Sequence, residues 1–502
     1  MTSLRCRLVG RVECYYGSMA FFQTIIHNIF LLYHVDLFVS VYKIDKMSFW
    51  VGETIFLIWN SLNDPLFGWL SDKQYLSRSN NHSEPPSSAL EVVTNRLNAL
   101  MYTGPLMAVS FVLFWFPWGY PGLQFAVCLC LYDGFLTMVD LHHSSLLADL
   151  AVSAKERTQL NTMSSFFSAI GSASVFFSYS VWSKENLSSF RIFCLCLAVF
   201  AFLGFFIAAN LMKHERTRSL KKSFSYDDSW SSRSDSYDGP GQAVKPGIVT
   251  FVSQLSKQRN FIWFTLMNLI QVFHCHFNSN FFPLFLENLL GNSVSSSFGS
   301  FLIGISFLAP HVNNLFFLEL CKRYGVYTVI QILFSIKLAL SLFMFFMGPN
   351  NLWLLCLFIA SNRVFTEGTC KLLNLVISDL VDEDYVLHNR KRAVSALIFG
   401  STALLSKPGQ TLAPLIGMWL LAMQTGHDIF QTSNKIVSLQ LGDGEVGPSA
   451  HEQYRQGCFN LLVYIPILCA VVQIAVWSQF KLHGHRLRWV KSCRTGTDHS
   501  LI

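Results

Sequence analysis

A carboxylate stands in the mostly apolar segment WNSLNDPLFGWLSDK, at Asp64. An ionised carboxylate is costly in hydrocarbon, so within a membrane-spanning segment Asp64 marks a functional site. Helical spacing places Asn60 and Asp64 on one face. Pro65 has no N–H to donate, and the carbonyl of Ser61 is therefore left free. These oxygens predict a site for a proton or for a monovalent cation such as Na⁺.

Two further segments carry charges that could complete this site. LYDGFLTMVDLHHSSLLADL holds Asp133 and Asp140 at helical spacing, and we predict that Asp140 supplies a second carboxylate. LLSKPGQTLAPLIG holds Lys407, followed by Pro408 and Gly409, so the helix is predicted to kink there. An isolated ammonium in an apolar segment needs a partner, and we predict that the acids of the other two segments provide it.

Histidines in two segments raise the question of a metal site. In QVFHCHFNSNFFP, the residues Gln271, His274 and Asn278 share one helical face, and we predict that they line a polar cavity together with the acid of LYDGF. Residues two apart do not converge on a helix, and adjacent residues such as His142 and His143 point in different directions. A metal site is therefore the weaker interpretation, and no metal or other cofactor is predicted.

A third set of charges lies in ASNRVFTEGTCKLLNLVISDLVDEDY. Arg363, Glu367 and Lys371 are spaced four residues apart, and such a ladder can neutralise itself along a helix. Two interpretations remain open, namely a self-paired packing element and a gating or substrate-binding role. Asp379 and Asp382 begin an acidic end of the same segment.

The composition indicates which elements position these residues. Of 502 residues, 52% are hydrophobic and 13% are charged, against roughly 25% charged in ordinary soluble domains. A membrane span needs about 20 mostly apolar residues. Most of the 13 cysteines lie in apolar runs and are interpreted as packing residues. Twelve spans are predicted, at 18–40, 48–70, 98–117, 122–149, 160–182, 191–212, 260–287, 297–320, 326–347, 351–382, 394–423 and 457–479.

The predicted spans divide the chain into two halves. A polar stretch rich in Ser, Asp, Lys and Arg follows the sixth span, and it has too few apolar residues to fold by itself. We therefore predict a six-helix half over 1–212, a flexible linker over 213–258, a second six-helix half over 259–480 and a tail over 481–502.

The basic residues indicate orientation. Most of the 37 Lys and Arg residues lie in the two tails, the central linker and the even-numbered loops, which predicts that these parts are cytoplasmic. The net charge of +7 is then explained by the basic residues of the cytoplasmic segments, which set the orientation in the membrane. No nucleic-acid partner is predicted. Asn186 begins an NLS tripeptide in an outer loop and is a candidate glycosylation site. The plasma membrane is the expected location.

Four motifs, in this order along the chain, resemble one branch of the major facilitator superfamily. NDPLFGWLSD, VDLHHSSL, SDLVDEDY and LLSKPGQTLAP are similar to the second-, fourth-, tenth- and eleventh-helix motifs of the glycoside–pentoside–hexuronide:cation symporters. The resemblance implies an all-α fold of twelve transmembrane helices in two halves with both termini cytoplasmic. It also implies a cation-site acid at Asp64, an acid near cation and substrate at Asp140, and a lysine near that site at Lys407.

The chain differs from that branch at four positions. Asn60 stands where the symporters have a second acid, Ala20 and Ser165 stand near their sugar-binding acid and arginine, and Ser144 replaces an aromatic residue. A single remaining carboxylate is better suited to a proton, or to holding Lys407, than to sodium-coupled sugar transport.

Two functions therefore compete. We expect a monomeric secondary transporter of a small solute, coupled to H⁺ or Na⁺ and working by alternating access between the halves. The alternative is a non-transporting receptor or scaffold built on a carrier fold. No paired nucleophile and base and no dinucleotide fingerprint is found, so an enzyme is not expected.

Overall fold

The computed structural model describes residues 2–77, 89–151, 153–182, 186–227, 248–290, 296–390, 393–425 and 448–495. Every regular element in these ranges is a helix. The first part of the chain forms α1 (Thr2–Asp36), η1 (Leu37–Val41), α2 (Lys46–Ser77), α3 (Ala89–Trp115), α4 (Pro121–Leu150), α5 (Ala154–Ser172), α6 (Ser174–Val181) and α7 (Ser188–Asp227). The second part forms α8 (Ile248–Leu255), α9 (Arg259–Phe285), η2 (Leu286–Leu290), α10 (Ser296–Tyr324), α11 (Val326–Met347), α12 (Leu352–Leu387), α13 (Ser395–Thr425), α14 (Pro448–Trp477) and α15 (Gly484–Thr495).

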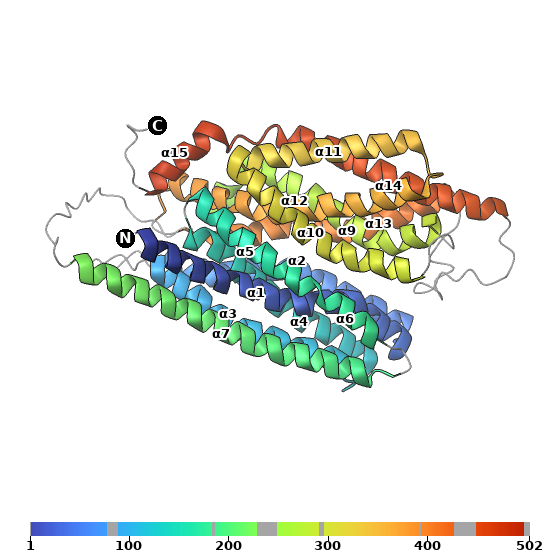
Figure 1. Cartoon of the computed structure of the whole chain (residues 1–502), viewed down its shortest axis with the longest axis horizontal. Helices are drawn as coiled ribbons and strands as arrows, with labels where there is room; N and C mark the ends of the chain where they lie inside the picture. The colour runs from blue at the N-terminus through green and yellow to red at the C-terminus, as the bar shows by residue number, and fades with distance from the viewer. Residues whose placement is uncertain are drawn as a thin grey trace.

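These helices form two bundles that lie side by side. Helices α1 to α7 occupy one bundle and α9 to α14 the other, and the start of α1 lies at the same end of the molecule as α15 (Figure 1). The bundles meet where α2 packs on α13 and α5 packs on α10, with α4 also contacting α12 and α13. This arrangement brings the segments of Asp64 and Lys407 together.

Glycines allow α2 and α13 to approach closely. A Cβ atom on Gly68 would lie 2.7 Å from the carbonyl oxygen of Ala396, and one on Gly400 would lie 2.6 Å from that of Asp64. Small residues at such crossings let helix backbones pack without side chains between them. The contact between the halves therefore depends on residues beside the candidate site.

Each of the twelve predicted spans falls mostly on helical residues of the structure, with one or two non-helical residues at the ends of several spans. The range 160–182 contains a break at Ala173, between α5 and α6. Within the described residues, five helical segments are apolar and long enough to cross a membrane by length and composition alone: 91–115, 121–150, 188–215, 326–347 and 452–477. The number of crossings and the side on which the termini lie remain predictions.

The ends of the predicted linker and the tail contain helix. Helix α7 continues to Asp227, because 211–222 is rich in Leu, Lys, Arg and Glu, which favour helix. Helix α8 precedes the second bundle, and 228–247 lie outside the described residues. In the tail, α15 packs against α12.

Candidate functional site

Lys407 of α13 reaches across to α2 and contacts four oxygen acceptors there. Its ammonium forms an ion pair with Asp64 and donates hydrogen bonds to the backbone carbonyl of Asn60 (2.7 Å) and to the side-chain oxygens of Asn60 (2.5 Å) and Asn63 (3.1 Å). The side chains of Lys407 and Asp64 are 17% and 12% exposed. These four residues are the Lys407 cluster. The backbone carbonyl that accepts from Lys407 is that of Asn60. The carbonyl predicted to be left free by Pro65 is that of the next residue, Ser61.

Asn63 connects this cluster to α4. Its amide nitrogen donates to Asp133 (2.5 Å) and to the hydroxyl of Thr137 (3.3 Å), while its oxygen accepts from Lys407. Asn63 is fully buried, so each of its polar atoms needs a partner. Asn63 was not among the predicted site residues. Its position one turn after Asn60, on the same face, is the signal that could have found it.

Asp140 lies in a different environment, exposed between the two bundles. Its carboxylate accepts a hydrogen bond from Gln23 of α1 (2.5 Å). Its charged neighbours are Lys371 of α12, Asp64 and Lys407, so it faces helices of both bundles. Asp140 therefore lies near the Lys407 cluster without sharing its hydrogen bonds.

Lys371 faces the same space from the second bundle. It is exposed, and it acts electrostatically on Asp140 of α4, His27 of α1 and His311 of α10. An exposed cation from one half and an exposed anion from the other thus attract each other electrostatically. Such an arrangement can bind a polar solute or exchange a proton.

The other two members of the predicted ladder have different surroundings. Arg363 is buried with its guanidinium 5.2 Å from the ring centroid of Phe282, and it is attracted by Glu367 one turn away. Glu367 also accepts a hydrogen bond from Ser279 (3.4 Å). Arg363 and Glu367 are thus embedded in the second bundle, and a gating role of the ladder Arg363, Glu367 and Lys371 remains a prediction.

Gln271, His274 and Asn278 all point into the second bundle. Gln271 donates to the carbonyl of Thr366 (2.8 Å), Asn278 donates to the Thr366 hydroxyl (3.1 Å), and His274 contacts the ammonium of Lys337 (3.1 Å). All three are buried against α11 and α12. These contacts hold the bundle together, and lining of a cavity remains a prediction for them.

Asn186 lies just before α7. Its side-chain oxygen accepts a hydrogen bond from the backbone of Ser188 (3.0 Å), and the residue is exposed. Exposure agrees with an acceptor role, and glycosylation remains a prediction.

A buried ion-pair network lies further along α2. Arg96 of α3 donates to Asp72 (3.0 Å), to Asp149 (2.5 Å) and to the hydroxyl of Ser71 (3.0 Å). Arg96 and Asp72 are almost fully buried. Asp72 also accepts from the backbone N–H of Leu397 (2.9 Å), and Asp149 accepts from the Ser395 hydroxyl. Arg96, Asp72 and Asp149 are the Arg96 cluster, and it attaches the first bundle to the start of α13.

A second network joins α5 to α12 at the same end. Arg157 donates to both oxygens of Asp382 (2.7 and 3.0 Å) and to Asp379 (3.2 Å). Helix α15 adds ion pairs from Lys491 to Asp379 (2.8 Å) and from Arg494 to Asp382. These five residues are the Arg157 cluster. Sequence patterns identify the acidic end of α12, but its partners come from distant segments.

The last turn of α12 is held by basic residues on its other side. Arg486 pairs with Glu383 (2.6 Å), and Arg390 pairs with Asp384 (2.5 Å). Burial by itself raises the pKa of Asp384, but interactions with His388 and Arg390 lower this pKa below its usual range. Asp384 is therefore ionised and anchors the turn that leads towards α13.

Comparisons with known proteins agree with this architecture. The family described as MFS/sugar transport protein matches residues 16–484 of the chain. A protein of Gallus gallus named Transmembrane protein 180 is 58% identical over 483 residues, which cover 96% of this chain and 94% of that protein. A protein of Mus musculus with the same name is 57% identical over 488 residues, which cover 95% and 94%.

Solved structures share the fold at low sequence identity. A bacterial homologue of the iron transporter ferroportin in an outward-facing state has a TM-score of 0.55 and 12% identity, over 94% of this chain and 98% of that one. The E. coli fucose:proton symporter FucP has a TM-score of 0.53 and 14% identity, over 92% and 98%. The family match spans nearly the whole chain, including both bundles and the Lys407 cluster. The chain therefore belongs to the MFS/sugar transport proteins and is a multi-pass membrane transporter rather than an enzyme.

Proposed function

We propose that the chain carries a small polar solute by alternating access, coupled to H⁺ or Na⁺ at Asp64. The observation that carries this proposal is the ion pair between Lys407 and Asp64, which joins the two bundles. Both residues lie in mostly apolar helices, where a retained charge pair needs a functional or an assembly role. Twelve membrane crossings with both termini in the cytoplasm complete the proposal.

The coupling step is a competition for Asp64. When the carboxylate is ionised, Lys407 neutralises it and holds α13 against α2. A proton or Na⁺ at Asp64 removes that attraction, and the ammonium keeps only its neutral acceptors on Asn60 and Asn63. The two forms then differ in how strongly the bundles are joined, which is the condition for an ion to shift a conformational equilibrium.

The proposed conformation is open towards the outside. The Arg96 and Arg157 clusters join the bundles at the end where α1 begins and where α15 lies. The basic residues of the tails assign this end to the cytoplasm. The ferroportin homologue is described as outward-facing, and a further FucP structure with a TM-score of 0.52 and 13% identity is described as being in the outward conformation, which supports the same state for this chain.

The solute site is proposed between Asp140 and Lys371. Both residues are exposed and they interact electrostatically, which supports this proposal. Ser165, near the position of the sugar-binding arginine in the symporter branch, accepts a hydrogen bond from Asn314 of α10 (2.5 Å) and serves helix packing. The solute therefore need not be a sugar.

A thermal-unfolding experiment tests the coupling site. Purified protein in detergent is heated in Na⁺, Li⁺ or K⁺ across about pH 5 to 8.5, with wild type beside Asp64→Asn and the surface control Glu319→Gln. We expect an ion-specific or pH-dependent shift in Tm that the control keeps and Asp64→Asn loses. Flat, identical curves for all three proteins would reject the coupling site and favour a receptor or scaffold.

The monomer and the plasma membrane are proposed as the working unit and the location. Asn186 precedes α7, whereas the other end of α7 lies near the start of α1, as the ion pair between Arg11 and Glu215 shows (3.9 Å). Asn186 is thus placed outside when the termini are cytoplasmic. A glycosidase-sensitive mass shift that Asn186→Gln abolishes would support this orientation.

A further inference from the structure

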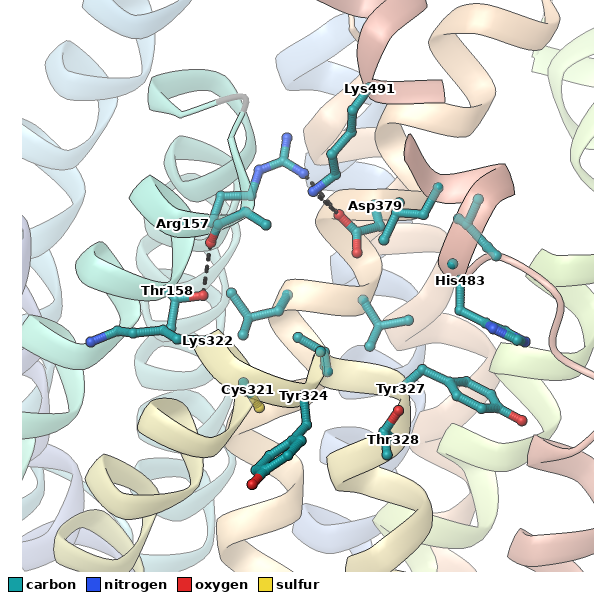
Figure 2. A pocket seen from close by; sticks show the side chains of 18 of the residues that line it. Arg157, Thr158, Cys321, Lys322, Tyr324, Tyr327, Thr328, Asp379, His483 and Lys491 are labelled. Carbon is teal, nitrogen blue, oxygen red and sulfur yellow. Dashed lines mark hydrogen bonds and ion pairs between the residues drawn. The ribbon is translucent and has the colours of Figure 1, made fainter. Parts of the chain in front are cut away.

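A cavity of about 630 Å³ lies next to the Arg157 cluster, apart from Asp64 and Lys407. Its walls come from the start of α5, the ends of α10 and α14, the start of α11, the last turns of α12 and from α15 (Figure 2). Both bundles contribute to the cavity. Helix α5 belongs to the first bundle, α10, α11, α12 and α14 belong to the second, and α15 comes after the second bundle in the chain. The cavity is large enough to hold a ligand of several rings or a lipid headgroup.

The lining carries an excess of positive charge. Four cationic side chains, Lys155, Arg157, Lys322 and Lys491, line the cavity, against one lining acid, Asp379. Two further acids lie outside the lining, where Glu319 pairs with Lys322 (2.8 Å) and Asp382 pairs with Arg157 (2.7 Å). Arg157 and Lys491 share that acid at 3.2 and 2.8 Å, as the dashed lines of Figure 2 show for Asp379. Lys155 and Lys322 lie on the exposed side of the lining. The cavity is therefore electrostatically suited to an anion.

Backbone groups add to this preference. Helix α11 starts at the cavity after Gly325, which has φ of +81° and provides no side-chain cap. The first N–H groups of a helix have no partner within it, and the helix dipole makes this end positive. The Thr328 hydroxyl lies on the same first turn. Phosphate groups are bound by such combinations of helix start and cationic side chains.

The remaining wall is aromatic and aliphatic. It contains Tyr327, which stacks on His483 with ring centroids 3.9 Å apart, together with Trp477 and Phe480. Tyr324 at the end of α10 is 63% exposed. Aromatic residues beside basic ones are typical of the interface between membrane and water. A freely soluble anion has no apolar part that could pack against these aromatic walls. A phospholipid has both a charged headgroup and apolar chains.

We propose that this cavity binds the phosphate-bearing headgroup of an anionic phospholipid from the leaflet at this end. Lys155, Lys322 and the start of α11 hold the phosphate, and the wall of Tyr327 and Phe480 packs on the glycerol and the upper acyl chain. Basic pockets between transmembrane helices are known to hold such headgroups. Because α5 and α12 both line the cavity, the bound lipid stabilises the conformation in which the Arg157 cluster is formed. The inference does not depend on ion coupling at Asp64.

Thermal unfolding in lipid nanodiscs tests the proposal. The full chain is placed in phosphatidylcholine alone, or with about a tenth of phosphatidylserine or phosphatidylinositol bisphosphate. We expect Tm to rise by several degrees with phosphatidylinositol bisphosphate and by less with phosphatidylserine. The variant Lys155→Gln/Lys322→Gln should lose most of this rise and keep its Tm in phosphatidylcholine, because both side chains are exposed. Native mass spectrometry should show fewer retained anionic lipids on the variant.

A charge-matched control separates a site from general surface attraction. Lys257 and Arg488 are exposed basic residues outside the cavity lining. If Lys257→Gln/Arg488→Gln loses the lipid effect equally, or if no lipid raises Tm, the proposal is overturned. Inorganic phosphate and soluble inositol hexakisphosphate are added to the protein in phosphatidylcholine as a separate arm. If they reproduce the full shift, the cavity is a site for a free anion and not for a lipid.

Discussion

Charged residues join the two bundles at several places, and the Lys407 and Arg96 clusters differ in how many partners each charge has. In the Lys407 cluster one ammonium faces one carboxylate, and its other acceptors are neutral oxygens of Asn60 and Asn63. In the Arg96 cluster one guanidinium bridges two buried carboxylates, which also accept hydrogen bonds from the start of α13. The first is a single exchangeable pair, and the second is a saturated network.

This difference indicates which contact can respond to an ion. A buried network with several partners for each charge resists change, because one proton or one cation can replace only one of its contacts. A single pair with neutral acceptors can lose its attraction through one proton or one cation and still satisfy the ammonium. The Lys407 cluster is therefore suited to switching, and the two arginine clusters are suited to holding one end closed until the switch has occurred.

The largest expected effect comes from breaking the saturated network. Arg96→Ala leaves Asp72 and Asp149 buried without their cation, and we expect a loss of about 3–5 kcal/mol in the free energy of unfolding. Chemical unfolding in detergent measures this loss, with Arg323→Ala as an exposed control. A loss no greater than that of the control would show that the network is not what joins this end.

A double-mutant cycle at the single pair comes next. Lys407→Ala should destabilise the protein by leaving Asp64 unpaired, and Asp64→Asn added to it should recover part of the loss. We expect a coupling energy of about 1–3 kcal/mol between the two changes, measured by the same unfolding assay. Strictly additive losses would contradict a direct pair and would place the partner of Lys407 elsewhere.

The Arg157 cluster should be less sensitive than the Arg96 cluster. Arg157→Ala removes hydrogen bonds to Asp379 and Asp382, but Lys491 and Arg494 continue to neutralise these acids. We expect a loss of about 1–3 kcal/mol. Arg494→Ala should lower the free energy of unfolding more in the Arg157→Ala background than in wild type. Arg157 and Arg494 can each neutralise Asp382 when the other is absent. Independent losses would argue against shared acids.

The smallest effect is expected at an exposed carboxylate at the far end of α2. Asp45 accepts hydrogen bonds from the Ser48 backbone (2.9 Å) and from the Tyr120 hydroxyl (2.5 Å). Hydrogen bonds from Ser48 and Tyr120 lower the pKa of Asp45 to about 2. Its folded-state pKa is below the unfolded value of about 3.9, so its stabilising contribution is present above pH of about 4 and is lost as pH falls towards about 2. Asp45→Asn should flatten this part of the curve of Tm against pH. An unchanged curve would show that Asp45 contributes no pH dependence there.

The sequence alone determined the helical segments and the charges that matter within them. Runs of about 20 apolar residues form helices in a membrane because each helix satisfies its own backbone hydrogen bonds, so their positions depend on local composition. Asp64, Asp140 and Lys407 are visible for the same local reason, since a charge in an apolar run is costly wherever its partner lies. The acidic end of α12 was recognisable too.

Which side chains meet depends on how the helices pack in three dimensions. Asn63 and Gln23 contact the predicted acids from other helices, while Gln271 and its neighbours turn into the second bundle rather than towards the first. Arg157 meets Asp382 across the boundary between the bundles, and the cationic cavity beside it combines residues from both. Helical periodicity defines a face but not its neighbour, because the choice of neighbour depends on packing between segments that are far apart in the chain.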